Sequence, residues 1–245
     1  MKRHISTAAV IAVAVAAAVT GCSPRERDPF AGLSAEQIDR KASNATALAT
    51  SMRLNGTVVT EAGSVDLNLA VDNKGSCSGE ISPNGVGTVD IAKKGALAYI
   101  KGDEQFWRTN LSTYESSEAP PGKADDLIAS LQGQWIKATK EMREGMGFDL
   151  CELDKLSGIV SLGMGSGLAR GVDATENGQP IAVVYQRKGV RVTTMHVAKT
   201  GKPFPVRFLD AGDGMPTDVY LSDFNQPVDV AFPTADQVLD LSKVR

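Results

Sequence analysis

The chain opens with an apolar run that differs from everything after it. Ile5 to Thr20 are sixteen apolar or small residues, and they follow the basic start Lys2-Arg3. A helix that spans a bilayer needs about 20 such residues, so this run is too short. A short apolar run behind positive charge and before small residues is typical of an export signal. We therefore expect residues 1–21 to be a signal peptide.

Helical periodicity begins near Leu33. Ser34 and Gln37 have the spacing of a capping box, and Leu33 and Ile38 that of a hydrophobic staple. Apolar or small residues then recur at steps of four and three: Ile38, Ala42, Ala45, Ala49 and Met52. The pattern predicts a helix that starts after Ser34 and packs one face, with small side chains over much of it.

The period then changes to two. Val65, Leu67, Leu69 and Val71 alternate with mostly polar residues, which predicts a half-buried antiparallel strand. Turn-prone residues such as Asn73-Lys-Gly75 and Pro83-Asn-Gly85 separate further short runs. These runs predict a β-meander through Ser76–Ser82, Gly87–Lys93, Ala96–Lys101 and Phe106–Asn110.

A more helical interval divides the strands into two sets. It contains predicted helices at Asp125–Leu131 and Asp149–Leu162, the second capped by Gly163, and a possible short strand at Trp135–Thr139. Predicted strands and helices do not alternate one by one along the chain. This order disfavours a parallel βαβ sheet and indicates an α+β fold. Alternation returns at Ala169–Thr175, Pro180–Arg187, Val190–Ala198, Pro205–Asp210 and Thr217–Phe224, and Thr234 to Gln237 repeat the capping-box spacing.

Charge argues against nucleic acid as a partner. Lys2 and Arg3 belong to the signal, so 24 of the 26 basic side chains remain against 29 acidic ones, a formal balance of −5. No basic patch is left to neutralise phosphates. With 42% hydrophobic residues the chain has material for a substantial core, and its length suits one larger domain or two small ones.

Cys22 stands directly after the apolar run, in Val19-Thr-Gly-Cys22. This motif resembles the bacterial lipobox, in which the cysteine receives a diacylglyceryl group and becomes the first residue of the mature chain. Two acyl chains give a stable anchor, whereas one holds a protein only marginally. Residues 22–32, with two prolines and mixed charges, would then be a tether on the extracytoplasmic face of the cell membrane. The alternative is a plain secretory signal with Cys22 unmodified.

If Cys22 carries lipid, Cys77 and Cys151 remain as an even pair in an exported protein. Such a pair favours a disulfide. By loop-closure entropy this crosslink would stabilise the fold by about 4 kcal/mol. A catalytic or metal role for the two thiols is the alternative, but neither CxxC spacing nor a nearby histidine supports it.

The sequence offers little for an enzyme. After export only His196 remains, and strand alternation makes it a residue on a sheet face. A serine hydrolase would need a Gly-x-Ser-x-Gly elbow, and Gly165-Ser-Gly167 lacks that spacing. The pair Asp125-Asp126 lies near a helix start, where the helix dipole favours acids. We expect neither catalysis nor a cofactor or metal.

The order of these segments resembles the LppX/LprG-like lipoproteins, which share the half-barrel fold of the LolA and LolB lipoprotein carriers. The residues that carry the resemblance are Cys22, the capped helix with Arg53–Val59 after it, Val89–Tyr99, Phe106-Trp-Arg108 and Asp223–Pro233. The resemblance implies a single domain over residues 33–245, with a strongly curved antiparallel sheet of roughly ten strands wrapped around a few helices. It also implies binding of lipid or lipoprotein between the sheet and the helices.

An apolar inner face would line such a space, and each buried CH₂ of a lipid contributes about 0.8 kcal/mol. Two functions follow. The first is an anchored carrier for a lipid, glycolipid or acylated protein, with a membrane transporter or acceptor protein as partner. The second is a closed-core interaction or sensor lipoprotein without cargo, in which the same residues are ordinary core. The candidate lining residues are Val65, Leu67, Leu69, Val89, Ile91, Phe106, Ile128, Leu131, Val183 and Tyr185.

Overall fold

The structure is a computed structural model, and it describes residues 28–60, 63–112, 123–145, 148–159, 167–212 and 216–240. The expected signal peptide, Cys22 and the glycine cap at Gly163 lie outside these residues. None of the helices among the described residues is long and apolar enough to cross a membrane.

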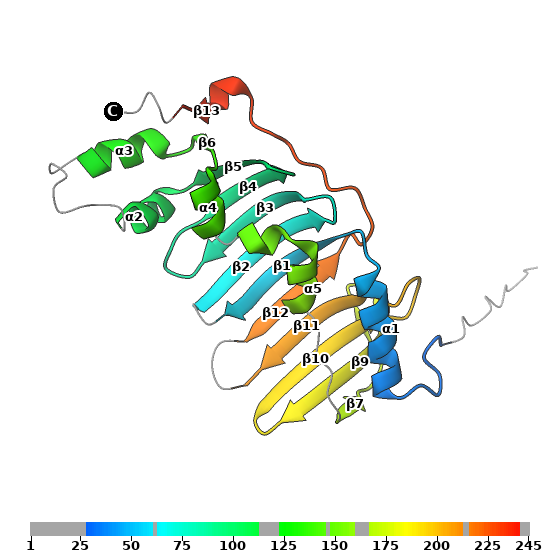
Figure 1. Cartoon of the computed structure of the whole chain (residues 1–245). Helices are drawn as coiled ribbons and strands as arrows, with labels where there is room; N and C mark the ends of the chain where they lie inside the picture. Colours follow the sequence, from blue (N-terminus) through cyan, green and yellow to red (C-terminus); the bar gives the residue numbers. More distant parts are fainter. Residues whose placement is uncertain are drawn as a thin grey trace, which may run out of the picture.

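Five α-helices and two short 3₁₀ turns are described (Figure 1). The first helix starts as expected, because the Ser34 side chain accepts from the Gln37 N–H and the Gln37 side chain accepts from the Ser34 N–H. The helical elements are α1 (Ala35–Ala47), α2 (Glu104–Ser112), α3 (Lys123–Leu131), α4 (Lys140–Gly145), η1 (Phe148–Cys151), α5 (Leu153–Ile159) and η2 (Ala235–Gln237).

Thirteen strands form one continuous, curved and unclosed sheet. Neighbouring strands are antiparallel, except that β13 runs parallel to β6. The strands are β1 (Ser51–Thr60), β2 (Gly63–Asp72), β3 (Ser76–Pro83), β4 (Val89–Lys94), β5 (Leu97–Gly102), β6 (Trp135–Lys137), β7 (Leu168–Arg170), β8 (Ala174–Glu176), β9 (Gln179–Lys188), β10 (Arg191–Ala198), β11 (Pro205–Ala211), β12 (Thr217–Ser222) and β13 (Val238–Leu239).

The two predicted sets of strands are the two halves of this sheet. In spatial order the strands run β13-β6-β5-β4-β3-β2-β1-β12-β11-β10-β9-β7, and β8 pairs with β9. The halves join where β1 pairs with β12, so the first and the last long strands of the chain are neighbours. The expected α+β class with a strongly curved, mainly antiparallel sheet is confirmed.

Two glycines permit close contact between strands in the middle of the sheet. Gly56 in β1 and Gly79 in β3 have φ of +137° and +144°. A Cβ on Gly56 would lie 2.1 Å from the Asp218 carbonyl oxygen, and one on Gly79 would lie 1.9 Å from the Asn68 carbonyl oxygen. Glycine inside a strand often marks a bend where another backbone approaches closely. The absence of a side chain at these two positions therefore lets neighbouring backbones approach closely where the long strands bend.

Helices α1, α4 and α5 lie over one face of the sheet, which we call the inner face (Figure 1). α1 contacts β7, β9 and β11, and α5 contacts α1. The predicted disulfide is present: Cys77 of β3 and Cys151 of η1 are bonded, and both are buried. The crosslink fixes the short helical segment η1–α5 to the inner face.

Three local predictions differ from the structure, and one helix was not predicted. Phe106–Asn110 belongs to α2 and not to a strand, because the Asp103 carboxylate accepts from the Phe106 N–H as a helix cap. The helix expected at Asp149–Leu162 is divided into η1 and α5, and α4 was not expected. The strand expected at Ala169–Thr175 is interrupted between β7 and β8 at Gly171–Asp173, where Gly171 lies tightly against Val183.

Candidate functional site

The inner face carries the hydrophobic core. Leu54, Leu69, Ile91, Ile100 and Ile136 form a row across neighbouring strands, and none is more than 2% exposed. A second row continues the inner face across the C-terminal half of the sheet. It consists of Val219, Phe208, Met195 and Val184.

Between α1, α5 and the second row lies a cavity of about 330 Å³. Small side chains of α1, among them Ala42 and Ser43, line this space. Met195 and Pro205 form its apolar floor. The cavity is lined by Ala42, Ser43, Thr46, Ala47, Asp154, Ser157, Gly158, Met195 and Pro205.

A second cavity of about 670 Å³ adjoins the first, since Thr46, Ala47, Asp154 and Ser157 line both. It continues past the end of α1 to the β2–β3 turn, and its walls are more polar. We call the two together the α1–α5 groove. The additional lining residues are Ala49, Asp72, Asn73, Gly75, Lys93, Cys151, Glu152 and Leu153.

Charges are distributed unevenly along this groove. Lys93 in the second cavity donates to the Gly75 carbonyl oxygen at 3.1 Å, and Asp72 accepts from two backbone N–H groups of the same turn. Asp39 lies one turn before Ser43 on α1 and is only 3% exposed. Burial raises the pKa of Asp39 to about 6, and the hydroxyl of Ser43, which donates to it at 3.5 Å, lowers this pKa only in part.

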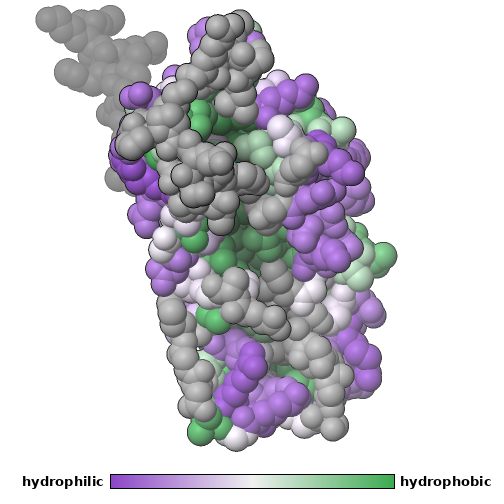
Figure 2. All heavy atoms as spheres, turned by 60° about the vertical axis from the view of Figure 1, so that its left-hand side comes forward, coloured by the Kyte–Doolittle hydropathy of each residue, from purple (hydrophilic) through white to green (hydrophobic). Residues whose placement is uncertain are grey.

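A hollow lined by hydrophobic residues is visible on the molecular surface. Figure 2 shows the molecule with its α2 and α3 side turned forward, and hydrophobic residues gather in a depression near the middle of this face. Hydrophilic residues lie to either side of it in this view. Apolar surface close to polar surface suits an amphiphilic ligand, because tails gain from burial and headgroups stay hydrated.

Eight of the ten predicted lining residues belong to the apolar cluster on the inner face. Leu67, Leu69, Val89 and Ile91 are buried on strands, and Val65 packs against them. Phe106 from α2 and Ile128 and Leu131 from α3 are buried at the β5 end of the cluster. None of these eight lines the α1–α5 groove, so their role in ligand binding stays a prediction.

Val183 and Tyr185 lie elsewhere. They alternate along β9 with Ala182 and Val184, which belong to the inner-face cluster. Because successive side chains of a strand point to opposite faces, Val183 and Tyr185 face away from α1. Apolar residues occupy both faces of β9, so the period of two in the sequence does not tell which face packs against the helices. We remove them from the candidate lining.

The groove residues themselves were only partly anticipated. The small residue Ala42 lies on the predicted packing face of α1, and the steps of four and three indicated that face. Ala49 and Met52, which were expected to continue it, lie beyond the end of the helix at Ala47. Met195 and Pro205 come from distant strands, and no local pattern links them to α1. Their contribution depends on the pairing of β10 with β11, which a single sequence does not specify.

The outer face carries a separate polar cluster. His196 Nδ1 lies 2.7 Å from a Glu176 carboxylate oxygen, while Arg207 donates to Glu176 at 3.2 Å and to both Asp218 oxygens. In the part of the chain that the structure describes, no hydroxyl bonds to His196, and no group of three metal-ligating side chains occurs. The cluster therefore has the composition of an ion-pair network on a sheet face.

The curved, unclosed sheet with helices on its inner face matches the α+β fold of the LppX/LprG lipoproteins. The crystal structure of LprF from Mycobacterium bovis is similar to 82% of this chain and 97% of its own, with a TM-score of 0.53 and 15% identity. The crystal structure of the lipoprotein LppX from Mycobacterium tuberculosis matches 80% of this chain and 98% of its own, with a TM-score of 0.45 and 14% identity.

No family model and no curated protein match the sequence. At such low identity the likeness to LprF shows the fold alone. It confirms the resemblance that the order of the segments indicated. It does not identify a ligand, which has to be inferred from the residues of this chain.

Proposed function

We propose that this protein is a membrane-anchored carrier that holds the acyl chains of a lipid, glycolipid or acylated protein in the α1–α5 groove. The observation that carries the proposal is the groove itself, with an apolar floor at Met195 and Pro205 and a polar mouth at Lys93 and Asp72. Its two cavities, of about 330 and 670 Å³, are in the size range of small-molecule sites.

The energetics favour an acyl ligand. Each CH₂ that moves from water into the groove contributes about 0.8 kcal/mol, so eight such groups contribute about 6 kcal/mol before the cost of ordering the chain. No catalytic group is required. The Ala-rich surface of α1 supports this reading, because small side chains leave space that larger ones would fill.

Anchoring completes the proposal. Cys22 would carry the diacylglyceryl group. The tether expected at residues 22–32 is shorter, because Asp28 and Phe30 are held to the sheet by Arg170 and Lys199, and residues 22–27 would hold the folded body close to the extracytoplasmic face of the membrane. A carrier in that place takes cargo from the bilayer and passes it to a transporter or an acceptor protein. The similarity to LprF supports this proposal through the fold alone.

A closed-core interaction lipoprotein is the second candidate, and one observation favours it. Leu67, Leu69, Val89 and Ile91 are each at most 3% exposed, so the N-terminal half of the inner face is filled by protein side chains. In that case the groove would be a surface depression without cargo.

A blocking substitution separates the two candidates. Ala47 lines both cavities and is exposed at the end of α1, so Ala47→Trp should fill the groove without disturbing the core. Leu48→Trp is the matched control, because Leu48 is the next residue, is 78% exposed and lines neither cavity. We expect Ala47→Trp to lose at least tenfold in affinity for a fluorescent fatty acid, about 1.4 kcal/mol.

The control should bind like the wild type. Equal binding by all three proteins would show that the groove is not the acyl site. Absence of saturable binding to the wild type would favour the closed-core candidate.

A further inference from the structure

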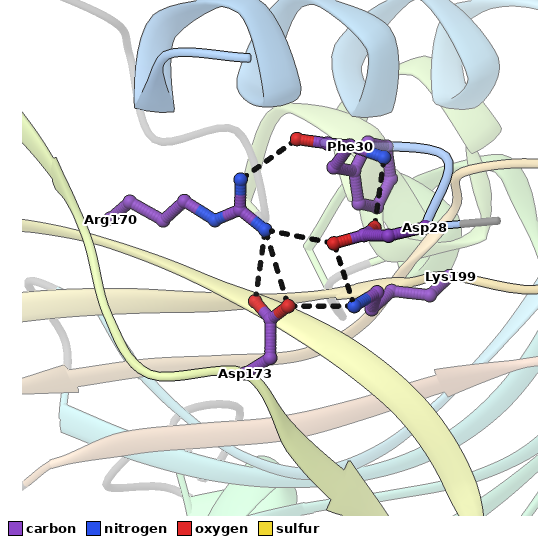
Figure 3. A network of polar contacts seen from close by, with 5 residues as sticks. All are labelled: Asp28, Phe30, Arg170, Asp173 and Lys199. Carbon is purple, nitrogen blue, oxygen red and sulfur yellow. Dashed lines mark hydrogen bonds and ion pairs between the residues drawn. The ribbon is translucent and has the colours of Figure 1, made fainter. Parts of the chain in front are cut away.

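The first described residues are held to the sheet by a cluster of charges (Figure 3). Arg170 donates to the Phe30 carbonyl oxygen at 2.8 Å and lies 3.4 Å from the Asp28 carboxylate. Lys199 bridges Asp28 at 3.1 Å and Asp173 at 2.6 Å. The cluster therefore joins the start of the folded chain to the β7–β8 connection and to the end of β10.

The side chains of this cluster are partly shielded from solvent and form several ion pairs with one another. Its four charged side chains are 15 to 33% exposed, and several contacts share the same partners. Networks with partial shielding from water hold better than isolated exposed pairs. The Phe30 N–H and the Lys199 ammonium lower the pKa of Asp28, which keeps this carboxylate ionised and paired at neutral pH. The Phe30 side chain, 1% exposed, adds an apolar anchor beneath it.

The charge cluster limits how far a lipid on Cys22 can lie from the folded body. Six residue steps separate Cys22 from Asp28, and a chain spans at most about 3.6 Å per residue in any conformation. The Cα atom of Cys22 can therefore be no more than about 22 Å from that of Asp28. Since Asp28 is fixed on the sheet, this corner of the molecule stays within that distance of the anchor, and other parts of the molecule can lie farther from it.

An exposed apolar side chain stands at the same corner. Val172 lies between Arg170 and Asp173 in the β7–β8 connection and is 90% exposed. Two cations and two anions of the cluster cancel, so the corner adds no net negative charge, although the mature chain carries −5. A corner without net charge is not repelled by anionic lipid, and an exposed apolar side chain there can add to the membrane affinity that a covalent lipid supplies.

We propose that the tether corner, formed by Asp28–Phe30, Arg170–Asp173 and Lys199, is the membrane-facing surface of the anchored protein, and that Val172 contacts the bilayer interface. The inference rests on the proposed lipidation of Cys22. Burial of one valine contributes only about 1.5 kcal/mol, too little to bind a membrane alone. The tether makes the contact effective because it keeps the corner at a high local concentration of lipid.

A tryptophan at this position tests the contact. Lipidated Val172→Trp is reconstituted in vesicles of phosphatidylcholine and phosphatidylglycerol whose acyl chains carry bromine, which quenches nearby indoles. The matched control is Val190→Trp in the β9–β10 turn, where Val190 is also an exposed valine, at 67%. Val190 and Lys199 flank β10, and the nine residue steps between them place the two residues about 30 Å apart.

We expect the added fluorescence of Val172→Trp to be quenched several times more than that of Val190→Trp. Adding Asp28→Ala and Phe30→Ala to Val172→Trp should lower the quenching toward the level of the control, because the Asp28 ion pairs and the buried Phe30 side chain that hold the start of the chain are then both removed. Equal quenching of both tryptophans, or stronger quenching of Val190→Trp, would overturn the proposal.

The result is independent of cargo binding. A protein that carries no lipid cargo can still show the orientation, so failure of the carrier function leaves this readout intact. Flotation of the vesicles checks the anchor first. If the wild-type protein does not float with the vesicles, it carries no lipid anchor, and the proposed membrane-facing orientation is wrong.

Discussion

Among the described residues Asp39 is the charged side chain that is buried. Its burial on α1 lowers the free energy of unfolding at neutral pH. Burial raises its pKa to about 6, above the value of about 3.9 expected in the unfolded chain. The folded state then binds more protons between these two values, so the contribution of Asp39 to stability is greatest below about pH 4 and is lost as pH rises through 6. At neutral pH the ionised form destabilises the fold.

We therefore predict that Asp39→Asn stabilises the protein at pH 8 by up to about 3 kcal/mol and has little effect near pH 4. Urea unfolding of both proteins at the two pH values measures the difference. Glu36→Gln is the control on the same helix, because a hydrogen bond from its own backbone N–H and another from Ser34 lower the pKa of Glu36. That substitution should not stabilise at pH 8. An equal effect of Asp39→Asn at both pH values would contradict the account.

Single residues also show what sequence reasoning could reach. The capping box at Ser34 and Gln37 and the pairing of Cys77 with Cys151 were predictable, because local spacing and the count of cysteines carry that information. The position of Val183 on the outer face was not, since it depends on which half of an alternating strand meets α1. The helix cap at Asp103 had a signal in sequence, but the aromatic residues after it favoured a strand.

At the scale of elements, the curvature of the sheet depends on where strands approach one another. Gly79 in β3 has a positive φ, and a side chain there would collide with the backbone of β2. The turn glycines between the strands were expected, whereas these interior glycines lie within predicted strands and no periodicity distinguishes them. Their role follows only from the paired structure.

We predict that Gly79→Ala destabilises the protein by about 1 to 3 kcal/mol or more, because both the backbone conformation and the contact with Asn68 must change. Gly158→Ala is the matched control, since a Cβ at this helical position meets nothing within 4 Å. It should be neutral or stabilise by up to about 1 kcal/mol. Thermal or urea unfolding measures both, and similar stability of the two variants would contradict the proposed strand contact.

At the scale of the whole molecule, the sheet, the groove and the tether corner form one arrangement. The strands on both sides of the β1–β12 pairing give one curved sheet, and the disulfide holds η1 and α5 over it. The α+β class and most strands could be predicted, because their periodicity is local. The joining of the two halves and the groove could not, because they arise from contacts between residues far apart in the chain.

The lipid content of the purified protein tests the central claim most directly. The folded body, with Cys22→Ser to remove the anchor, is purified from a bacterial host without detergent and analysed by native mass spectrometry and then by lipid extraction. The account predicts a bound acyl lipid in a fixed ratio to protein in the wild-type body and in Leu48→Trp, and its loss in Ala47→Trp. Repeated preparations of the wild-type body without lipid, and without saturable uptake of added lipid, would contradict it.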